Sequence, residues 1–232
     1  MEQSHIHTDA YLRLAAECAA KNVTLVAVSK TKPIEDIHAL YELGHRDFGE
    51  NYVQELVEKQ QQLPADIRWH FIGHLQTNKV KQIVDFVHLI HAVDSFKLLQ
   101  EINKQAEKIK RNADCLLQVH IAREETKFGL NEQELNDLVD QIGNAQLHNV
   151  AVCGLMGMAS FTDDLNKVRE EFKFLKSLQD RLANIKRQTS NIKLQTLSMG
   201  MTADYKIAIE EGSNMIRVGS LILLFRGRGY AA

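Results

Sequence analysis

Several features that mark whole classes of protein are missing from this sequence. Its three cysteines, Cys18, Cys115 and Cys153, lie far apart and include no Cys-x-x-Cys pair, which excludes a disulfide framework and indicates a reducing compartment. The 28 basic and 30 acidic residues form no basic stripe, so nucleic acid is not an expected partner. No apolar run reaches the ~20 residues of a membrane span, and residues 1–9 contain no apolar signal core. We therefore expect a soluble, cytoplasmic protein that binds neither membrane nor nucleic acid.

The sequence also lacks the signs of a divided or metal-binding architecture. It contains no linker, low-complexity tract or internal repeat, and no Gly-x-Gly-x-x-Gly turn follows its first apolar run. His5 and His7 have no further ligands at metal-binding spacing, so we expect no metal site. With 232 residues, of which 44% are hydrophobic, the chain is long enough to bury a full core. We expect one domain that spans residues 1–232.

What the sequence does contain is an alternation of short apolar runs and longer amphipathic ones. Unbroken apolar runs are typical of parallel strands buried on both faces, and apolar residues at steps of three and four indicate helices. Eight strands are predicted, at residues 23–29, 46–49, 69–72, 87–92, 115–121, 150–156, 194–198 and 215–218. Helices are predicted at residues 8–20, 34–43, 52–62, 80–85, 95–111, 132–142, 164–187 and 203–211.

This alternation predicts the fold. Eight strands that alternate with helices in this length favour a (β/α)8 TIM-like barrel, with the helix at residues 8–20 as an extra N-terminal element. A doubly wound open sheet is the alternative. Ser95 and Thr202 are expected to cap the helices that follow them. In such a barrel the functional side chains gather at the carboxyl ends of the strands, and phosphate is often bound after strands seven and eight.

A lysine ends the first predicted strand. Lys30 directly follows the apolar run, where partial desolvation would favour an uncharged amine able to attack an aldehyde. The alternative is an ordinary solvated lysine at a strand end. Lys32 is a rival nucleophile, but it lies beyond the strand and beside Pro33, so we expect it to be the more exposed of the two.

Two loops near the end of the chain have the composition of anion-binding sites. Ser198, Gly200 and Met201 lie in a strand-to-helix turn that would point several backbone N–H groups at one spot, where the helix dipole also attracts an anion. Gly219 and Ser220 follow the eighth predicted strand. Each loop alone is also consistent with an ordinary turn. Because the ends of strands seven, eight and one follow one another around the rim of a closed barrel, the loops and the strand-end lysine together predict a site for pyridoxal 5'-phosphate, held as a Schiff base.

Three further residues are candidates for contacts with the cofactor ring. An arginine beside the pyridine nitrogen would keep that nitrogen unprotonated, because two positive charges repel, and Arg217 is placed to do this. Its alternative role is a structural ion pair with Glu210 or Glu211. Asn51 is a candidate partner of the ring hydroxyl, with helix capping as its alternative. Met156 is a candidate ring contact, although packing inside the barrel is the commoner role of such a residue.

The segments that carry these residues resemble a known family. From Val23 to about Leu221 the sequence resembles the pyridoxal phosphate homeostasis proteins, relatives of the alanine racemase barrel. The motifs that carry the resemblance are A-V-S-K-T-K (27–32), F-G-E-N-Y (48–52), H-F-I-G-H-L-Q-T-N-K (70–79), G-L-M (154–156), L-S-M-G-M (197–201) and V-G-S (218–220). One segment departs from the pattern: after Ser220 the family usually has an Ile-Phe-Gly type ending, whereas this chain continues L-I-L-L-F-R-G-R-G-Y.

The resemblance implies a fold-type III pyridoxal phosphate barrel and a role in the balance of vitamin B6 pools, without robust turnover of a substrate. Pyridoxal phosphate and the apoenzymes that accept it would then be its partners. It also implies roles for eight of the candidate residues: Lys30 carries the Schiff base, Ser198, Gly200, Met201, Gly219 and Ser220 hold the phosphate, Arg217 faces the ring nitrogen, and Asn51 lies near the ring.

Two enzymatic functions are the alternatives to this carrier role. A racemase-like enzyme acting on amino acids would need a base on each face of the substrate carbanion, and little sequence follows the eighth predicted strand to supply a second domain. A Schiff-base aldolase acting on a phosphorylated sugar would need a proton shuttle, for which Tyr205 is the candidate. We expect the carrier function, and a monomer.

Overall fold

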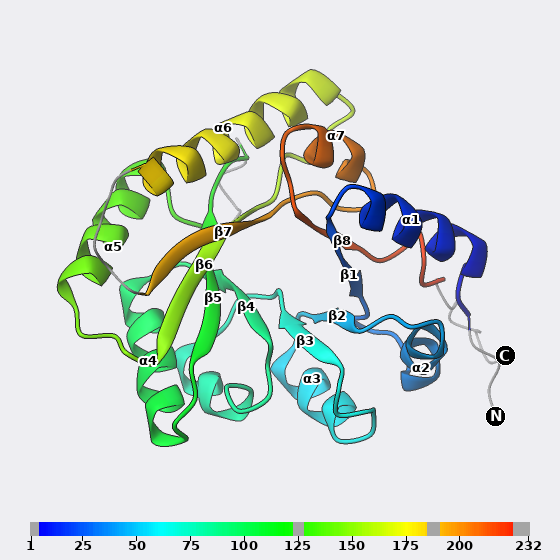
Figure 1. Ribbon diagram of the computed structural model, residues 1–232, viewed down its shortest axis with the longest axis horizontal. Helices are drawn as coiled ribbons and strands as arrows, with labels where there is room; N and C mark the ends of the chain where they lie inside the picture. Colours follow the sequence, from blue (N-terminus) through cyan, green and yellow to red (C-terminus); the bar gives the residue numbers. More distant parts are fainter. Residues whose placement is uncertain (1–4, 123–127, 185–190, 225–232) are drawn as a thin grey trace, which may run out of the picture.

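The structure, a computed structural model, describes residues 5–122, 128–184 and 191–224. Eight parallel strands close into a barrel in the order in which they occur in the chain, and β1 pairs with both β2 and β8 (Figure 1). The predicted barrel is confirmed. Its strands are β1 (Thr24–Val28), β2 (Asp47–Glu50), β3 (Arg68–Phe71), β4 (Leu89–Val93), β5 (Ala113–Val119), β6 (Val150–Gly157), β7 (Ile192–Ser198) and β8 (Met215–Val218).

Helices lie outside the barrel and connect successive strands. Helix α1 precedes the first strand, as predicted. The helices are α1 (Thr8–Ala20), α2 (Ile34–Glu42), α3 (Val53–Gln60), α4 (Phe96–Lys108), α5 (Glu132–Asn144), α6 (Leu165–Asn184) and α7 (Tyr205–Glu210), with a 3-10 helix η1 (Thr77–Gln82) between β3 and β4.

Some local predictions need correction. The helix predicted at residues 80–85 is the short 3-10 helix η1, which begins three residues earlier. Ser95 caps α4 as predicted, with its Oγ 3.4 Å from Leu98 N. Thr202 does not cap α7, whose N-cap is Asp204, so that prediction is wrong. The predicted end of α6 at residue 187 and the chain from residue 225 lie outside the described residues.

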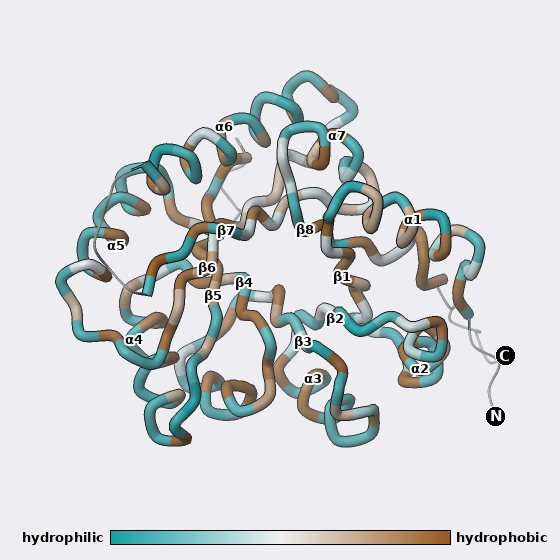
Figure 2. The backbone as a smooth tube through the Cα atoms, in the orientation of Figure 1, coloured by the Kyte–Doolittle hydropathy of each residue, from teal (hydrophilic) through white to brown (hydrophobic). Residues whose placement is uncertain are grey.

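The core has two parts, because neighbouring residues in a strand face opposite sides of the sheet. In β1, Leu25 and Ala27 belong to the large cluster between the sheet and the helices, and Val26 belongs to a smaller cluster inside the barrel. Hydrophobic residues predominate in strands such as β4 and β6 and on the inner sides of the helices, and the outer sides of the helices are hydrophilic (Figure 2). The barrel interior also contains polar side chains, and these form part of the candidate site.

The segment after Ser220 that departs from the family pattern packs against the N-terminal segment. Ile222 and Leu223 are fully buried, and Leu223 forms an antiparallel bridge with Ile6. Backbone hydrogen bonds run from His7 N to Ile222 O and from Leu224 N to His5 O, both 3.0 Å long. The two ends of the described chain therefore secure each other beside β1 and β8.

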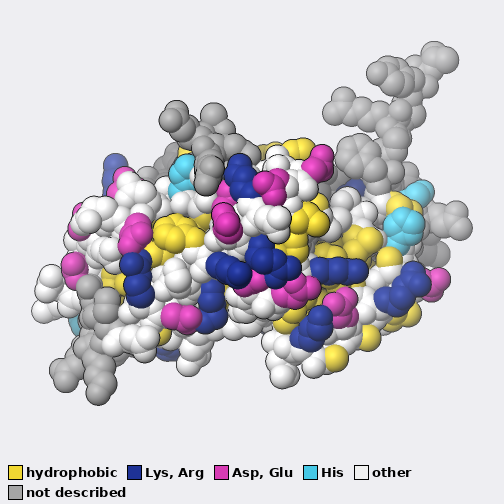
Figure 3. All heavy atoms as spheres, turned by 90° about the horizontal axis from the view of Figure 1, so that it is seen from above, with side chains coloured by type: hydrophobic (Ala, Val, Ile, Leu, Met, Phe, Trp, Pro, Cys, Tyr) yellow, Lys and Arg dark blue, Asp and Glu magenta, His cyan; other side chains and the backbone are white. Residues whose placement is uncertain are grey.

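The face over α6, α7 and α1 carries basic and acidic side chains in alternation (Figure 3). Many of them are paired: Arg169 with Glu210 and Glu211, and Lys176 with Asp180. Within the described residues, no helix combines the length and the apolar character that a membrane crossing requires.

Candidate functional site

A cavity of about 660 Å³ opens at the carboxyl ends of β1, β6, β7 and β8. It is the place where the fold predicts a functional site in a barrel. Five of the nine candidate residues line it: Lys30, Met201, Arg217, Gly219 and Ser220. The other four lie behind or beside this lining: Asn51, Met156, Ser198 and Gly200.

Lys30 is exposed at the mouth of this cavity. Lys32 is the less exposed lysine, since its Nζ donates to Leu224 O at 2.6 Å, so the expected order of exposure is wrong. The reason is the backbone: Thr31 has a φ of +60°, and Lys32 N bonds back to Ser29 O at 3.0 Å. This tight turn leaves Lys30 at the opening and brings Lys32 against the C-terminal segment.

Hydrogen-bond donors converge where β7 and β8 end. Gly219 N and Ser220 Oγ both lie 3.4 Å from Thr202 Oγ1, at the long limit for hydrogen bonds. Three donors that meet loosely at one point are suited to an anion such as a phosphate group. Sequence reasoning missed Thr202 as a member of this group, because it assigned Thr202 to the helix cap.

Gly200 and Met201 contribute mainly through the backbone. Gly200 has a φ of +96°, and a Cβ there would lie 2.5 Å from Ala208 Cβ, so only glycine fits this turn. Its carbonyl accepts a hydrogen bond from Arg217 N at 3.0 Å, which ties the turn to β8. Met201 N donates to the Asp204 carboxylate at 2.6 Å, and its side chain lines the cavity.

Arg217 lies at the floor of the cavity and is only 4% exposed. Its guanidinium donates to Ser198 Oγ at 2.6 Å and to Gly157 O at 3.1 Å. It does not pair with Glu210 or Glu211, which bind Arg169 instead. Burial lowers its pKa to about 10, so it remains a cation at neutral pH.

Ser198 is fully buried and bonds to Arg217 and, at 3.2 Å, to His91 Nδ1. Its hydroxyl therefore supports Arg217 from behind. Met156 is 1% exposed and packs in the cluster inside the barrel. The Oδ1 of Asn51 is buried without a hydrogen-bond partner among the described residues, and Asn51 does not cap α3, whose N-cap is Tyr52. An unsatisfied buried acceptor near strand ends is consistent with a polar ligand group.

A buried charged cluster holds the backbone on both sides of Lys30, and sequence reasoning missed it. Lys59 of α3 is 5% exposed, and its ammonium donates at 2.7 Å to each of Ser29 O, Glu50 Oε1 and Glu55 Oε1. Ser29 Oγ donates to Glu50 Oε1 at 2.6 Å, and Thr31 N donates to Glu55 Oε1 at 2.6 Å. We call Glu50, Glu55 and Lys59 the strand-end clamp. It fixes the residues that precede and follow the cavity lysine.

The clamp predicts a pH dependence of stability. Burial raises the pKa of Glu50 to about 7, and the opposing effect of the Lys59 ammonium offsets this rise only in part. The Oε2 atom of Glu50 has no hydrogen-bond partner among the described residues. The pKa of Glu50 is thus about 7 in the folded protein and 4.5 in the unfolded chain. The protonated carboxyl group contributes its full stabilisation at a pH below 4.5, and this contribution is lost as the pH rises to about 7. The gap between the two values corresponds to about 3 kcal/mol. We therefore expect the free energy of unfolding of the native protein to fall between pH 5 and 8 relative to that of Glu50→Gln.

Urea unfolding of both proteins across this pH range measures the difference directly. Glutamine keeps the shape of the side chain and can still accept from Lys59 and Ser29, but it does not titrate. The expectation is wrong if the two proteins show the same slope of stability with pH.

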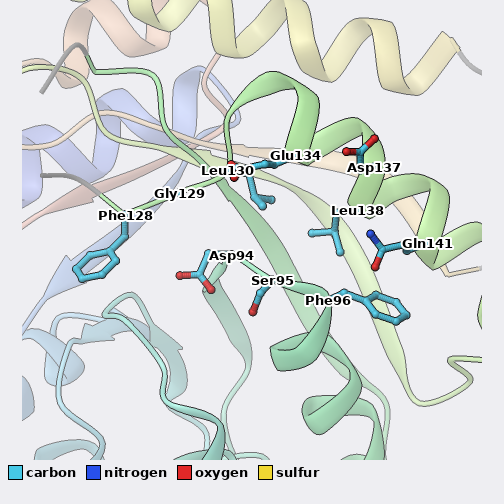
Figure 4. Close-up of a pocket in the computed structure, with 10 residues that line it drawn as sticks. All are labelled: Asp94, Ser95, Phe96, Phe128, Gly129, Leu130, Glu134, Asp137, Leu138 and Gln141. Atoms are coloured by element: carbon cyan, nitrogen blue, oxygen red, sulfur yellow. The ribbon is translucent and has the colours of Figure 1, made fainter. Parts of the chain in front are cut away.

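A second cavity, of about 610 Å³, lies between the end of β4 and the first turns of α5 (Figure 4). Asp94 lines it from one side, and Glu134 and Asp137 from the other. None of the nine candidate residues belongs to it. Three carboxylates around one space repel an anion, so a phosphate group would be placed in the first cavity and not in this one.

Comparisons with known proteins agree on one family. The family model described as the N-terminal domain of alanine racemase matches residues 8–226 of this chain. The chain is 41% identical to a pyridoxal phosphate homeostasis protein of Pasteurella multocida, over 90% of this chain and 88% of the relative. It is 39% identical to the human protein of the same name, over 89% of this chain and 77% of that one.

Solved structures agree with the sequence relatives. PipY of Synechococcus elongatus with PLP bound is similar with a TM-score of 0.79 and 33% identity, over 91% of this chain and 98% of that chain. An alanine racemase of Clostridium difficile shares the fold, with a TM-score of 0.67 and 15% identity over 90% of this chain and 54% of that chain.

Proposed function

Because the chain belongs to the family of pyridoxal phosphate homeostasis proteins, built on the fold of the N-terminal domain of alanine racemase, we propose that it binds pyridoxal 5'-phosphate and takes part in the intracellular balance of this cofactor. The observation that carries the proposal is the lining of one cavity. A lysine, an arginine with spare donors and a loose group of hydroxyl and N–H donors face the same space.

The residues of this cavity fit the chemical groups of the cofactor. When bound, pyridoxal phosphate supplies an aldehyde that condenses with a lysine amine, and Lys30 is the exposed lysine at the cavity mouth. The donors of Thr202, Gly219 and Ser220 would hold the phosphate group. Arg217 would orient the ring nitrogen and keep it unprotonated, since a second positive charge beside a buried guanidinium is unfavourable.

These features favour storage and release of the cofactor over turnover of a substrate. An unprotonated ring nitrogen makes the cofactor a weak electron sink, which disfavours decarboxylation and transamination. Racemisation would need a base on each face of the substrate carbanion. The aldolase alternative loses its proton shuttle, because Tyr205 does not line the cavity. Burial and the nearby Glu17 carboxylate also raise the pKa of the Tyr205 phenol. We propose a cytoplasmic monomer that passes the cofactor to apoenzymes.

Titration of the purified protein with pyridoxal phosphate, followed by borohydride reduction and peptide mapping, tests this function. The expected result is a visible absorbance that saturates at one equivalent and a reduced adduct on Lys30. Protein that takes up no cofactor would contradict the proposal. With loaded protein, assays of single amino acids should detect no turnover; robust racemase activity would favour the enzymatic alternative.

A further inference from the structure

A chain of hydrogen bonds crosses the interior of the barrel, from the cavity to the opposite end of the sheet. Its links are Arg217 Nη1 to Ser198 Oγ (2.6 Å), Ser198 Oγ to His91 Nδ1 (3.2 Å), His91 Nε2 to His70 Nδ1 (3.0 Å) and His70 Nε2 to Asp47 Oδ1 (3.0 Å). We call these residues the barrel chain. The side chains come from β8, β7, β4, β3 and β2, and the link from Ser198 on β7 to His91 on β4 joins strands that are not neighbours in the closed barrel (Figure 1).

Every member of the barrel chain is buried. Ser198, His70 and His91 are fully buried, and Arg217 and Asp47 are 4% and 8% exposed. Buried polar groups must find their partners inside the protein, and a satisfied network of this kind is rigid. Because water reaches little of this network, each of its donors has to find an acceptor within the protein.

The two ends of the barrel chain fix the direction of its hydrogen bonds. A guanidinium can only donate, so Arg217 donates to Ser198. A carboxylate can only accept, and Asp47 is a carboxylate because Arg68 binds both of its oxygens. Burial opposes ionisation of Asp47, but the hydrogen bonds from Arg68 and His70 hold its pKa far below the usual range. His70 must then carry a proton on Nε2.

Two assignments of the remaining protons are consistent with these ends. If His70 is neutral, its Nδ1 accepts from His91 Nε2, and His91 Nδ1 accepts the hydroxyl proton of Ser198. Each donor then has one acceptor. If His70 is charged, His91 is reversed and donates to Ser198 Oγ, which would receive two donors and keep a hydroxyl proton with no acceptor among the described residues.

The neutral assignment is favoured by charge as well as by hydrogen bonding. Asp47 is already neutralised by Arg68, so a charged His70 would add an unpaired positive charge to the interior. His91 lies between His70 and Arg217, and burial, together with these neighbours, holds its pKa well below the usual range. All hydrogen bonds of the barrel chain then point from Arg217 towards Asp47.

We propose that His91, His70 and Asp47 are positioning residues for Arg217. Both imidazoles are neutral and carry their proton on Nε2, and this order keeps Ser198 Oγ turned as an acceptor towards the guanidinium. The inference rests on the proposed function only for its effect on the cofactor. The state of the two imidazoles and of Arg217 is a property of the protein alone.

Nitrogen NMR of the unliganded, ¹⁵N-labelled protein tests the order directly, because it distinguishes the two neutral tautomers from imidazolium. At neutral pH we expect His70 and His91 to be neutral with the proton on Nε2. We also expect guanidinium proton signals from Arg217, protected from exchange with water. A charged imidazole, or a proton on Nδ1 of either histidine, would overturn the proposal whatever the protein does with pyridoxal phosphate.

Asp47→Asn should reverse the direction of the hydrogen bonds in the barrel chain, and it does so from the end that lies farthest from Arg217. The amide can keep its oxygen on Arg68 and turn its N–H group towards His70 Nε2, which moves the imidazole proton to Nδ1; an Asp to Asn change has this effect in a serine protease triad. The expected result is a tautomer change at both histidines and faster exchange of the Arg217 guanidinium protons. His91→Phe, which cuts the chain without a change of charge, should produce the same loss at Arg217.

His88→Gln is the matched control. The His88 ring packs 5.4 Å from that of His70 but is not part of the barrel chain. This variant should leave the Arg217 signals unchanged.

Cofactor binding gives a second readout. Asp47→Asn and His91→Phe should bind pyridoxal phosphate roughly tenfold more weakly than the native protein and shift the absorbance of the bound cofactor, whereas His88→Gln should match the native protein. Unchanged Arg217 signals in both chain variants would overturn the positioning role, and absence of cofactor uptake by the native protein would refute only the proposed function.

Discussion

Lys30→Ala is expected to abolish the borohydride-reducible adduct completely while the protein remains folded. The side chain is exposed at the cavity mouth, so its removal creates no core cavity, and the change in the free energy of unfolding should stay within about 0.5 kcal/mol. The covalent link needs an amine, and alanine has none. Mass spectrometry after borohydride reduction measures the adduct, and urea unfolding measures the stability.

Lys32→Ala is the control for this experiment, because Lys32 lines the same cavity only two residues away. Its ammonium is occupied by Leu224 O, so we expect Lys32→Ala to keep the adduct on Lys30. A reducible adduct that persists in Lys30→Ala and disappears in Lys32→Ala would transfer the nucleophile to Lys32. The comparison is informative because the structure reversed the order of exposure that the sequence suggested.

The barrel was predictable because its strands are buried on both faces. A strand such as β1 then reads as an unbroken apolar run, and the run ends where the strand ends. The predicted strands differ from the observed ones by one or two residues in most cases. Short elements were less predictable: η1 has six residues, too few for a helical period to distinguish a 3-10 from an α-helix.

The cavity was predictable in part, because parallel strands bring their carboxyl ends to one rim. This rule placed Lys30, Arg217, Gly219 and Ser220 together, and they do line one cavity. It could not show which side chains stand behind that lining. Whether Lys59 meets Glu50, or His70 meets His91, depends on the rotation of α3 and on the register of β3 against β4, which no local pattern encodes.

The strand-end clamp leads to the largest expected effect on stability. Lys59→Met is expected to lower the free energy of unfolding by about 3–5 kcal/mol at pH 8, because it leaves two carboxylates in and beside the core without their cation. The Ser29 carbonyl also loses one of its two donors and keeps only Lys32 N. Methionine keeps the length and apolar contacts of the lysine stem, so the loss reports the charge and not the packing.

The pH dependence and a surface control distinguish this explanation from a general loss of helix stability. Protonation of Glu50 removes the unpaired charge, so the loss in Lys59→Met should shrink towards pH 5, and Glu50→Gln in the same chain should restore part of it. Lys176→Met removes an ion pair of the same i,i+4 spacing from an exposed helix face and should cost less than about 1 kcal/mol. If urea unfolding gives equal losses for the two lysine variants, Lys59 is an ordinary helix lysine and the clamp does not hold the strand end.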